Sequence, residues 1–149
     1  MEITLKRKII DAIPQKEPFR FIDDLHLVNE NSAIGEYTYK EGEYFYDGHF
    51  PGNPVTPGVI LIETMAQIGV LSLGIYLTQL NSLNSKIYFT SSEVSFKKHV
   101  RPGEKIIVES EKVFFRANML KCKVKMLNSF NQVICRGILS GVFIDDVEN

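Results

Sequence analysis

His49 and Glu63 are the two residues whose types and spacing best suit acid–base chemistry in this sequence. An unperturbed imidazole has a pKa of about 6.5, so a histidine can accept or release a proton near neutral pH. Glu63 follows fourteen positions later among apolar neighbours, and burial among such neighbours raises the pKa of a carboxyl group. A base that works near neutrality, paired with a carboxyl group of raised pKa, is the arrangement that general acid–base catalysis requires.

The segment between these two residues is rich in glycine and proline, which indicates a loop of fixed shape. Gly48 marks a tight turn directly before the histidine. Thr56 is expected to be the N-cap of a helix, and Pro57 its first residue. Gly58 then leaves the backbone N–H groups at the positive end of the helix open to another molecule, which suits the stabilisation of an oxyanion.

The helix that begins here is expected to be enclosed by the rest of the protein. Residues 59–76 are apolar on almost every face, and Gln67 lies one turn after Glu63, where its amide can hold the carboxyl group. Residues 58–77 also approach the length of a membrane span, which needs about 20 apolar residues. The two polar side chains in the first half favour a buried helix of a soluble protein instead, ended by a turn over 81–85.

The rest of the chain is predicted to be mainly β. A short amphipathic helix over 6–13 is expected to act as a lid on the fold. Alternating apolar residues and turn residues predict six strands, over 19–28, 33–39, 87–100, 105–115, 119–127 and 132–144. The pattern therefore predicts an α+β protein with one buried helix and a mostly antiparallel sheet, organised as one domain over residues 1–149.

Composition narrows the class of function. A net charge of −1 gives no support for nucleic acid as the main partner. Two cysteines, Cys122 and Cys135, are too few for a disulfide framework and are expected to be core residues in a reducing compartment. The N-terminus lacks the apolar region of a secretory signal. We therefore expect a cytoplasmic protein, and the absence of a glycine-rich phosphate loop or a ligand cluster predicts no metal or nucleotide cofactor.

The ordered spacing of several short motifs resembles the signature of the FabZ-type β-hydroxyacyl-acyl-carrier-protein dehydratases. These motifs are His49-Phe50-Pro51, Pro54-Val55, Pro57-Gly58-Val59 and Glu63-Thr64-Met65-Ala66-Gln67. Weaker matches over 18–23 and 95–104 extend the resemblance over nearly the whole chain. It implies the hot-dog fold, an antiparallel sheet wrapped around one long buried helix. It also implies elimination of water from a 3-hydroxyacyl thioester, giving a trans-2-enoyl thioester for fatty acids or for related polyketides or pigments.

Such a dehydration gives a role to each candidate residue. His49 would remove the proton beside the carbonyl group, and the backbone N–H of Gly58 would stabilise the developing oxyanion. Glu63, held by Gln67, would protonate or orient the departing hydroxyl group. The family motif also places two substrate-positioning residues directly after the histidine, Phe50 and Pro51.

The resemblance further implies a carrier-protein partner and a homodimer. The substrate would hang from the phosphopantetheine arm of an acidic acyl carrier protein. The clearest basic cluster is a candidate docking surface, against the alternative of an ordinary solvated face: Lys97, Lys98 and Arg101. In the implied dimer, His49 of one subunit faces Glu63 of the other. The family also forms trimers of dimers, and the sequence does not choose between these assemblies.

Two other functions stay open. A hot-dog acyl thioesterase would use the carboxylate to activate water but would have no need for His49. A non-catalytic acyl-carrier-binding protein would share the fold without the chemistry. Two departures from the family pattern, Thr64 for a common alanine and Asp24 for a frequent arginine, could mark a branch serving polyketide or pigment synthesis. The acyl chain length cannot be read from the sequence, because the side chains that line the tunnel come together only in three dimensions.

Overall fold

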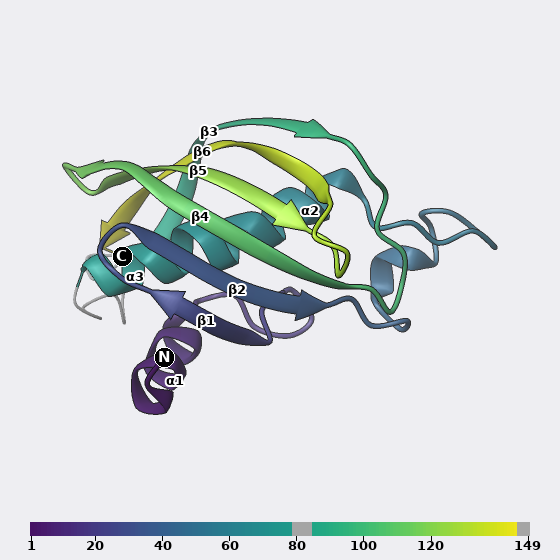
Figure 1. Ribbon diagram of the computed structural model, residues 1–149, viewed down its shortest axis with the longest axis horizontal. Helices are drawn as coiled ribbons and strands as arrows, with labels where there is room; N and C mark the ends of the chain where they lie inside the picture. The colour runs from purple at the N-terminus through teal and green to yellow at the C-terminus, as the bar shows by residue number, and fades with distance from the viewer. Residues whose placement is uncertain (79–84, 146–149) are drawn as a thin grey trace.

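The computed structural model describes residues 1–78 and 85–145, which form an antiparallel sheet of six strands wrapped around one long helix (Figure 1). The strands lie in the order β1-β2-β4-β5-β6-β3 across the sheet. Their bounds are β1 Asp24–Val28, β2 Ser32–Thr38, β3 Ser85–Phe96, β4 Lys105–Arg116, β5 Met119–Leu127 and β6 Val133–Asp145. The α+β architecture expected from the sequence is therefore confirmed.

The central helix is continuous through three stretches: α2 (Gly58–Met65), the π-helical turn η2 (Ala66–Leu71) and α3 (Ser72–Leu77). It is long and apolar enough to cross a membrane, but 78% of its apolar window is buried inside the protein. It is therefore the core helix of the fold, as predicted for residues 59–76. A π-helical turn inside an α-helix often occurs at a functional site, and this one contains Gln67.

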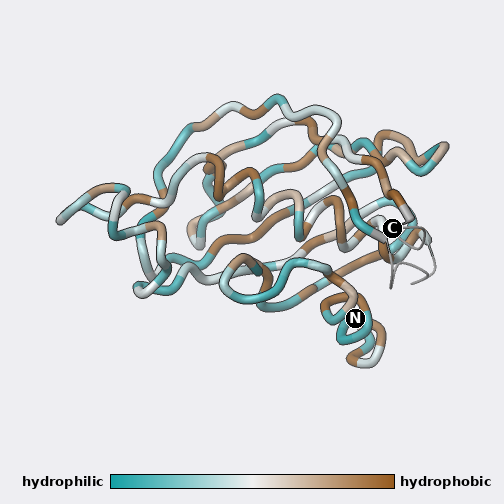
Figure 2. Tube along the Cα trace, turned by 180° about the vertical axis from the view of Figure 1, so that it is seen from behind, coloured by the Kyte–Doolittle hydropathy of each residue, from teal (hydrophilic) through white to brown (hydrophobic). Residues whose placement is uncertain are grey.

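Glycines let the central helix approach the sheet closely. A Cβ atom on Gly35 of β2 would lie 2.7 Å from the side chain of Ile68. A Cβ atom on Gly69 would lie 3.0 Å from Cβ of Ser110 in β4. Figure 2 shows hydrophobic segments along the helix and the strands, and hydrophilic segments in the outer loops. The core therefore lies between the helix and the inner face of the sheet.

Helix α1 (Ile3–Ala12) lies against α3 and β1, and it begins three residues before its predicted start. Ile9 and Ile13 are fully buried, as their helical spacing predicted. Lys6 Nζ lies 2.9 Å from Asp24 Oδ1 on β1. The hydrogen bond from Lys6 is the main reason why the pKa of Asp24 is below its ordinary value. Asp24 thus fixes α1 to the sheet, which gives this departure from the family pattern a structural explanation.

The strand predicted over 19–28 begins only at Asp24. Two backbone groups of the preceding residues bond to a side chain of the central helix instead of a neighbouring strand. The N–H of Phe21 donates to Gln67 Oε1 at 2.7 Å, and Gln67 Nε2 donates to the carbonyl oxygen of Phe19 at 3.0 Å. This segment is therefore held against the central helix at Gln67 and lies outside the sheet.

The strand predicted over 87–100 is also shorter, since β3 ends at Phe96. The N–H groups of Lys97 and Lys98 both turn to the carbonyl oxygen of Ile134, which ends the regular ladder. A bulge between Phe89 and Ser91 bends the strand, as its length suggested. Most of the turn predicted over 81–85 lies outside the described residues.

Both cysteines are core residues, as predicted. Cys122 and Cys135 are buried and unpaired with each other. Burial raises the pKa of Cys122 to about 11 and that of Cys135 to about 12. A thiol that stays protonated is a poor nucleophile, so these residues contribute packing rather than chemistry.

Candidate active site

A tight loop fixes one nitrogen of the His49 ring. Nδ1 lies 2.8 Å from the carbonyl oxygen of Val55, and because a carbonyl oxygen only accepts, Nδ1 carries the proton. The N–H of Val55 donates back to the carbonyl oxygen of His49 at 2.9 Å. The imidazole ring stacks on Phe50 with 4.0 Å between the ring centroids. Nε2 has no hydrogen-bond partner among the described residues, so it is the ring nitrogen available to a substrate.

His49 lines an open cleft of about 660 Å³. The cleft also contains Phe50, Gly58 and four basic residues, Lys97, Lys98, His99 and Arg101. The predicted base and the predicted docking residues therefore lie around one cleft, and none of the described residues that line it is acidic. The sequence did not single out His99, whose only signal was its place inside the basic cluster.

The basic cluster is connected to the histidine loop. Arg101 Nη1 donates to Asn53 Oδ1 at 3.2 Å, and Asn53 in turn exchanges two backbone hydrogen bonds with Phe50, at 3.1 and 2.8 Å. Pro51 is exposed at the tip of this loop and does not line the cleft. Pro51 therefore lies outside the lining of the cleft, and its substrate-positioning role stays a prediction.

Gly58 is the first residue of α2, and its N-cap is Pro57. The prediction of Thr56 as the N-cap is therefore wrong by one residue. The hydroxyl group of Thr56 forms a buried hydrogen bond of 2.6 Å with the hydroxyl group of Tyr46, and it does not cap a helix N–H group. The backbone N–H of Gly58 has no acceptor in the described part of the chain. A Cβ atom here would lie 3.2 Å from the ring of Phe96, so a side chain would crowd the cleft. The N–H group is therefore open to a substrate oxygen.

Gln67 holds Glu63 from one helical turn away. Its Nε2 donates to Glu63 Oε2 at 2.8 Å, as the spacing predicted. Gln67 is fully buried, and its other hydrogen bonds go to the backbone of Phe19 and Phe21. Burial raises the pKa of Glu63, and the hydrogen bond from Gln67 offsets only part of that rise. A carboxyl group in this setting remains a proton donor at a higher pH than an exposed glutamate.

The raised pKa of Glu63 predicts a pH dependence of stability. Because the folded protein holds this proton more tightly than the unfolded chain, the contribution to the unfolding free energy is highest below the ordinary pKa of 4.5 and falls as the pH rises through the raised value. The neutral variant Glu63→Gln has no such loss. Urea unfolding at several pH values should show its stability relative to wild type increasing with pH over this window, and a difference that stays constant with pH would contradict the assignment.

His49 and Glu63 line different hollows of the same chain. Glu63 lines a narrow hollow of about 60 Å³ between the central helix and strands β3 and β6. His49 does not line this narrow hollow, and Glu63 does not line the cleft of His49. One chain therefore presents the two predicted catalytic groups without bringing them into one space.

Thr64 has a structural partner that explains its presence beside Glu63. Its Oγ1 donates to the carbonyl oxygen of Ile60 at 2.8 Å, so the buried hydroxyl of Tyr39, 2.6 Å away, must donate to Oγ1. Neither Thr64 nor Tyr39 lines the narrow hollow or the cleft. Thr64 therefore has a structural role in the core, and its value as a mark of a specialised branch stays a prediction.

We expect Thr64→Val to lower the unfolding free energy by about 1–3 kcal/mol, because it leaves the hydroxyl of Tyr39 buried without an acceptor. The double variant Tyr39→Phe/Thr64→Val removes both polar groups and should be more stable than Thr64→Val alone. Chemical denaturation of wild type, Tyr39→Phe, Thr64→Val and the double variant measures this double-mutant cycle. Strictly additive losses would show that the hydrogen bond does not couple the two residues.

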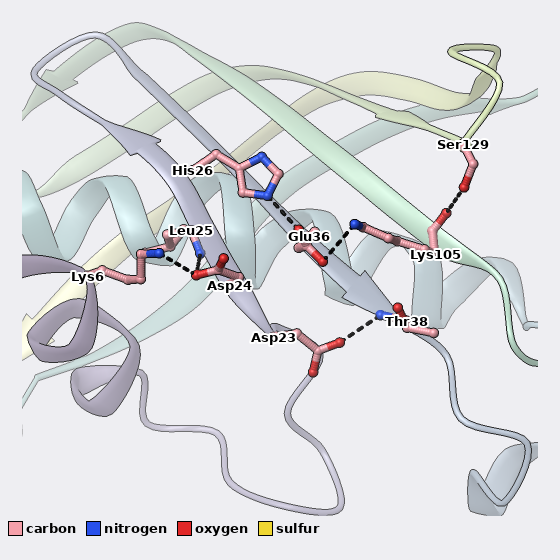
Figure 3. A network of polar contacts seen from close by, with 9 residues as sticks. All are labelled: Lys6, Asp23, Asp24, Leu25, His26, Glu36, Thr38, Lys105 and Ser129. Carbon is pink, nitrogen blue, oxygen red and sulfur yellow. Dashed lines mark hydrogen bonds and ion pairs between the residues drawn. The ribbon is translucent and has the colours of Figure 1, made fainter. Parts of the chain in front are cut away.

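A polar cluster on β1 and β2 has the spacing of a metal site (Figure 3). The ligand atoms of Asp24, His26 and Glu36 lie within 4.8 Å of one another. Both carboxylates already have basic partners: Lys6 lies 2.9 Å from Asp24, and Lys105 and His26 lie 3.2 and 2.6 Å from Glu36. The arrangement is an ion-pair network at the edge of the sheet opposite β3, and it contains none of the predicted catalytic residues.

The sequence is similar to a known family over most of its length. A family model described as a FabA-like domain matches residues 13–135. The 3-hydroxyacyl-[acyl-carrier-protein] dehydratase FabZ of Caldicellulosiruptor bescii is 34% identical over 134 residues, which cover 89% of this chain and 93% of that protein. The protein of the same description from Caulobacter vibrioides is 36% identical over 118 residues, covering 78% and 74%.

Solved structures share the fold at low sequence identity. A chain of the dehydratase heterocomplex ApeI:P from Xenorhabdus doucetiae aligns with a TM-score of 0.78 at 12% identity, covering 94% of this chain and 93% of that one. A hypothetical thioesterase with coenzyme A from Streptococcus pneumoniae aligns with a TM-score of 0.58 at 12% identity, covering 82% and 85%. These likenesses define the class of protein as one with the hot-dog fold. Within that class, the chain belongs to the FabA-like family and to its FabZ-type 3-hydroxyacyl-[acyl-carrier-protein] dehydratases.

Proposed function

We propose that this protein eliminates water from a 3-hydroxyacyl thioester on an acyl carrier protein and so forms the trans-2-enoyl thioester in fatty acid biosynthesis. Its family membership supports this hydro-lyase activity. The observation that carries the proposal is that the chain has both a candidate base, His49, and a candidate acid, Glu63. His49 has a ring nitrogen without a hydrogen-bond partner among the described residues, and Glu63 is a half-buried carboxyl group with a raised pKa. Elimination of water needs both a base and an acid of this kind.

The reaction balances with these groups alone. Nε2 of His49 removes a proton from C2, and the electrons move towards the thioester oxygen, where the N–H of Gly58 stabilises the negative charge. A donor of this type is worth about 2.7–4 kcal/mol. The bond between C3 and the hydroxyl oxygen then breaks as Glu63 donates its proton, which releases water and leaves the enoyl thioester. The proton on His49 returns to Glu63 through solvent, so no electron acceptor, metal ion or nucleotide enters the cycle.

A homodimer would bring the two catalytic groups together. Strand β3 is an edge of the sheet, and an edge strand offers unpaired backbone groups to another chain. Tyr88, Phe89 and Phe96 on this strand are 50%, 49% and 48% exposed, which is costly for a monomer. Phe96 lines the cleft of His49, and Phe89 lines the hollow of Glu63. A second copy paired along β3 would cover these side chains and could join the cleft of one subunit to the hollow of the other.

The shared site is tested by subunit complementation. His49→Ala and Glu63→Gln are expected to be inactive as separate preparations. Co-expressed in equal amounts, they form mixed dimers that carry one intact site each, so about a quarter of the wild-type activity should return. If every site were built within one chain, each chain would still lack one group and the mixture would stay inactive, which would disprove the shared site. Sedimentation of the wild type distinguishes a dimer from a trimer of dimers.

The cleft of His49 suits an acidic carrier protein. Three cationic side chains line it, Lys97, Lys98 and Arg101, and complementary charge speeds the encounter with an acidic partner. The phosphopantetheine arm is expected to enter beside these residues and to deliver the thioester to Gly58. We expect the protein to act as one domain in the cytoplasm, and its shared core and unpaired thiols support this.

Mass spectrometry of intact 3-hydroxyacyl carrier proteins of several chain lengths tests the activity. The expected product is the same carrier protein lighter by one water. Release of free acid with loss of the thioester would instead identify a thioesterase, a function that the fold also permits. Unchanged substrate, bound but not converted at any chain length, would identify a non-catalytic acyl-carrier-binding protein.

A further inference from the structure

The hollow beside Glu63 has a second polar group. Gln15 lines it, although no motif identified this residue. The other lining residues are apolar or lack a side chain: Ala66, Val70, Leu71, Ile87, Phe89 and Gly141. The hollow therefore combines two polar groups with apolar walls, which is typical of a site that orients a small polar part of an otherwise apolar ligand.

The amide oxygen of Gln15 is buried and has no hydrogen-bond partner among the described residues. Buried side-chain oxygens are rarely left in this state, because the loss of hydration is not compensated. Among the described residues, only two other buried side-chain atoms lack a hydrogen-bond partner, Arg20 Nε and Ser110 Oγ. Neither of these residues lines the hollow of Glu63. An acceptor that is unpaired in the free protein can be satisfied by a ligand that brings a donor.

The surrounding chain holds Gln15 in place. The buried side chain of Ile13 anchors the residues before it. The backbone after it is tied to Gln67, whose amide group also holds Glu63. Gln15 and Glu63 thus belong to segments that are fixed to the same buried amide group. The hollow is about 60 Å³ in volume, enough for a few water-sized groups, and both residues line it.

We propose that Gln15 is a positioning residue whose amide oxygen accepts the hydrogen bond from the C3 hydroxyl group of the substrate. This inference rests on the proposed dehydration. A hydroxyl group has one hydrogen and two lone pairs. When Glu63 donates its proton to one lone pair, the hydrogen of the hydroxyl group still needs an acceptor, and Gln15 supplies it. The bond between C3 and oxygen breaks, and the departing water has two hydrogens, one directed to the Glu63 carboxylate and one to Gln15.

Kinetics and stability of the full-length protein test this role together. Gln15→Met keeps the length of the side chain but removes the amide oxygen. We expect kcat for dehydration of 3-hydroxyacyl carrier protein to fall about tenfold, as for loss of one hydrogen bond in the transition state, while KM changes less than twofold. We also expect an unchanged or raised melting temperature, because the variant no longer buries an unpaired acceptor. Gln15→Glu retains an acceptor oxygen and should keep more activity than Gln15→Met.

Gln132→Met is the matched control, since Gln132 is exposed in a turn and bonds to Asn128 away from the hollow. Its kcat should equal that of wild type. An unchanged kcat in Gln15→Met, or a fall that accompanies a lower melting temperature, would overturn the positioning role and leave the dehydratase intact. A wild type without dehydratase activity would overturn the proposed function itself, and the role of Gln15 with it.

Discussion

His49→Ala is expected to lower kcat for dehydration by about 10³-fold, within the range found for loss of a general base. The Val55 carbonyl group accepts a hydrogen bond from Nδ1 of His49, which leaves Nε2 as the proposed base, and the substitution removes it with the ring. The fold should survive, because the side chain is only half-buried and lies in a loop. Mass-spectrometric rates of water loss, with circular dichroism to check folding, measure the effect.

His26→Ala is the control for this variant. His26 is an exposed histidine of β1 that contacts Glu36 at the far edge of the sheet. Its replacement should leave the rate of dehydration within twofold of wild type. If both variants dehydrate the substrate at the wild-type rate, His49 is not the base and the proposed mechanism is wrong.

Gly137→Ala is expected to cause the largest loss of stability among the single substitutions, about 3 kcal/mol of unfolding free energy. A Cβ atom at this position of β6 would lie 2.0 Å from the carbonyl oxygen of Glu93 and 2.8 Å from Cα of Val94. Both are backbone atoms of β3, so no rotation of a side chain can relieve the contact. The strand itself would have to move away, and urea denaturation would show an earlier midpoint.

Gly42→Ala provides the comparison. A Cβ atom on Gly42 would have no heavy atom within 4 Å, and its backbone needs no left-handed conformation. The same chemical change there should alter the unfolding free energy by less than about 0.5 kcal/mol. Equal losses in the two variants would mean that the close approach of β3 to β6 is not what requires glycine at position 137.

Local patterns predicted most of the fold. Alternation in β5 and uniform apolarity in the central helix each reflect burial, and burial can be read from the sequence because it repeats with the period of the element. The segment over 19–23 could not be predicted in this way. Its backbone partner is the side chain of Gln67, between 46 and 48 positions away, and no local pattern carries such a contact.

The candidate site was predictable only where its residues share a motif. His49, Gly58 and Glu63 stand in one stretch with recognisable spacing. Gln15 lies far from that stretch in sequence, and a lone glutamine after Pro14 carries no signal. The division of the site between two hollows was implied by the family resemblance, but it depends on the sheet and the helix being wrapped together. Such information exists only after folding.

Gln67 links Glu63, the proposed catalytic acid, to the chain before β1. One amide group makes three hydrogen bonds, to Glu63, to Phe19 and to Phe21. With Glu63 as the proposed proton donor, local unfolding of residues 19–21 is expected to loosen its orientation, so the population of active molecules would follow the opening equilibrium of this segment. By thermodynamic reciprocity, a substrate that needs an oriented Glu63 must in turn slow amide exchange at Phe21. The segment before β1, which lies outside the sheet, would thus belong to the same cooperative unit as the proposed catalytic acid.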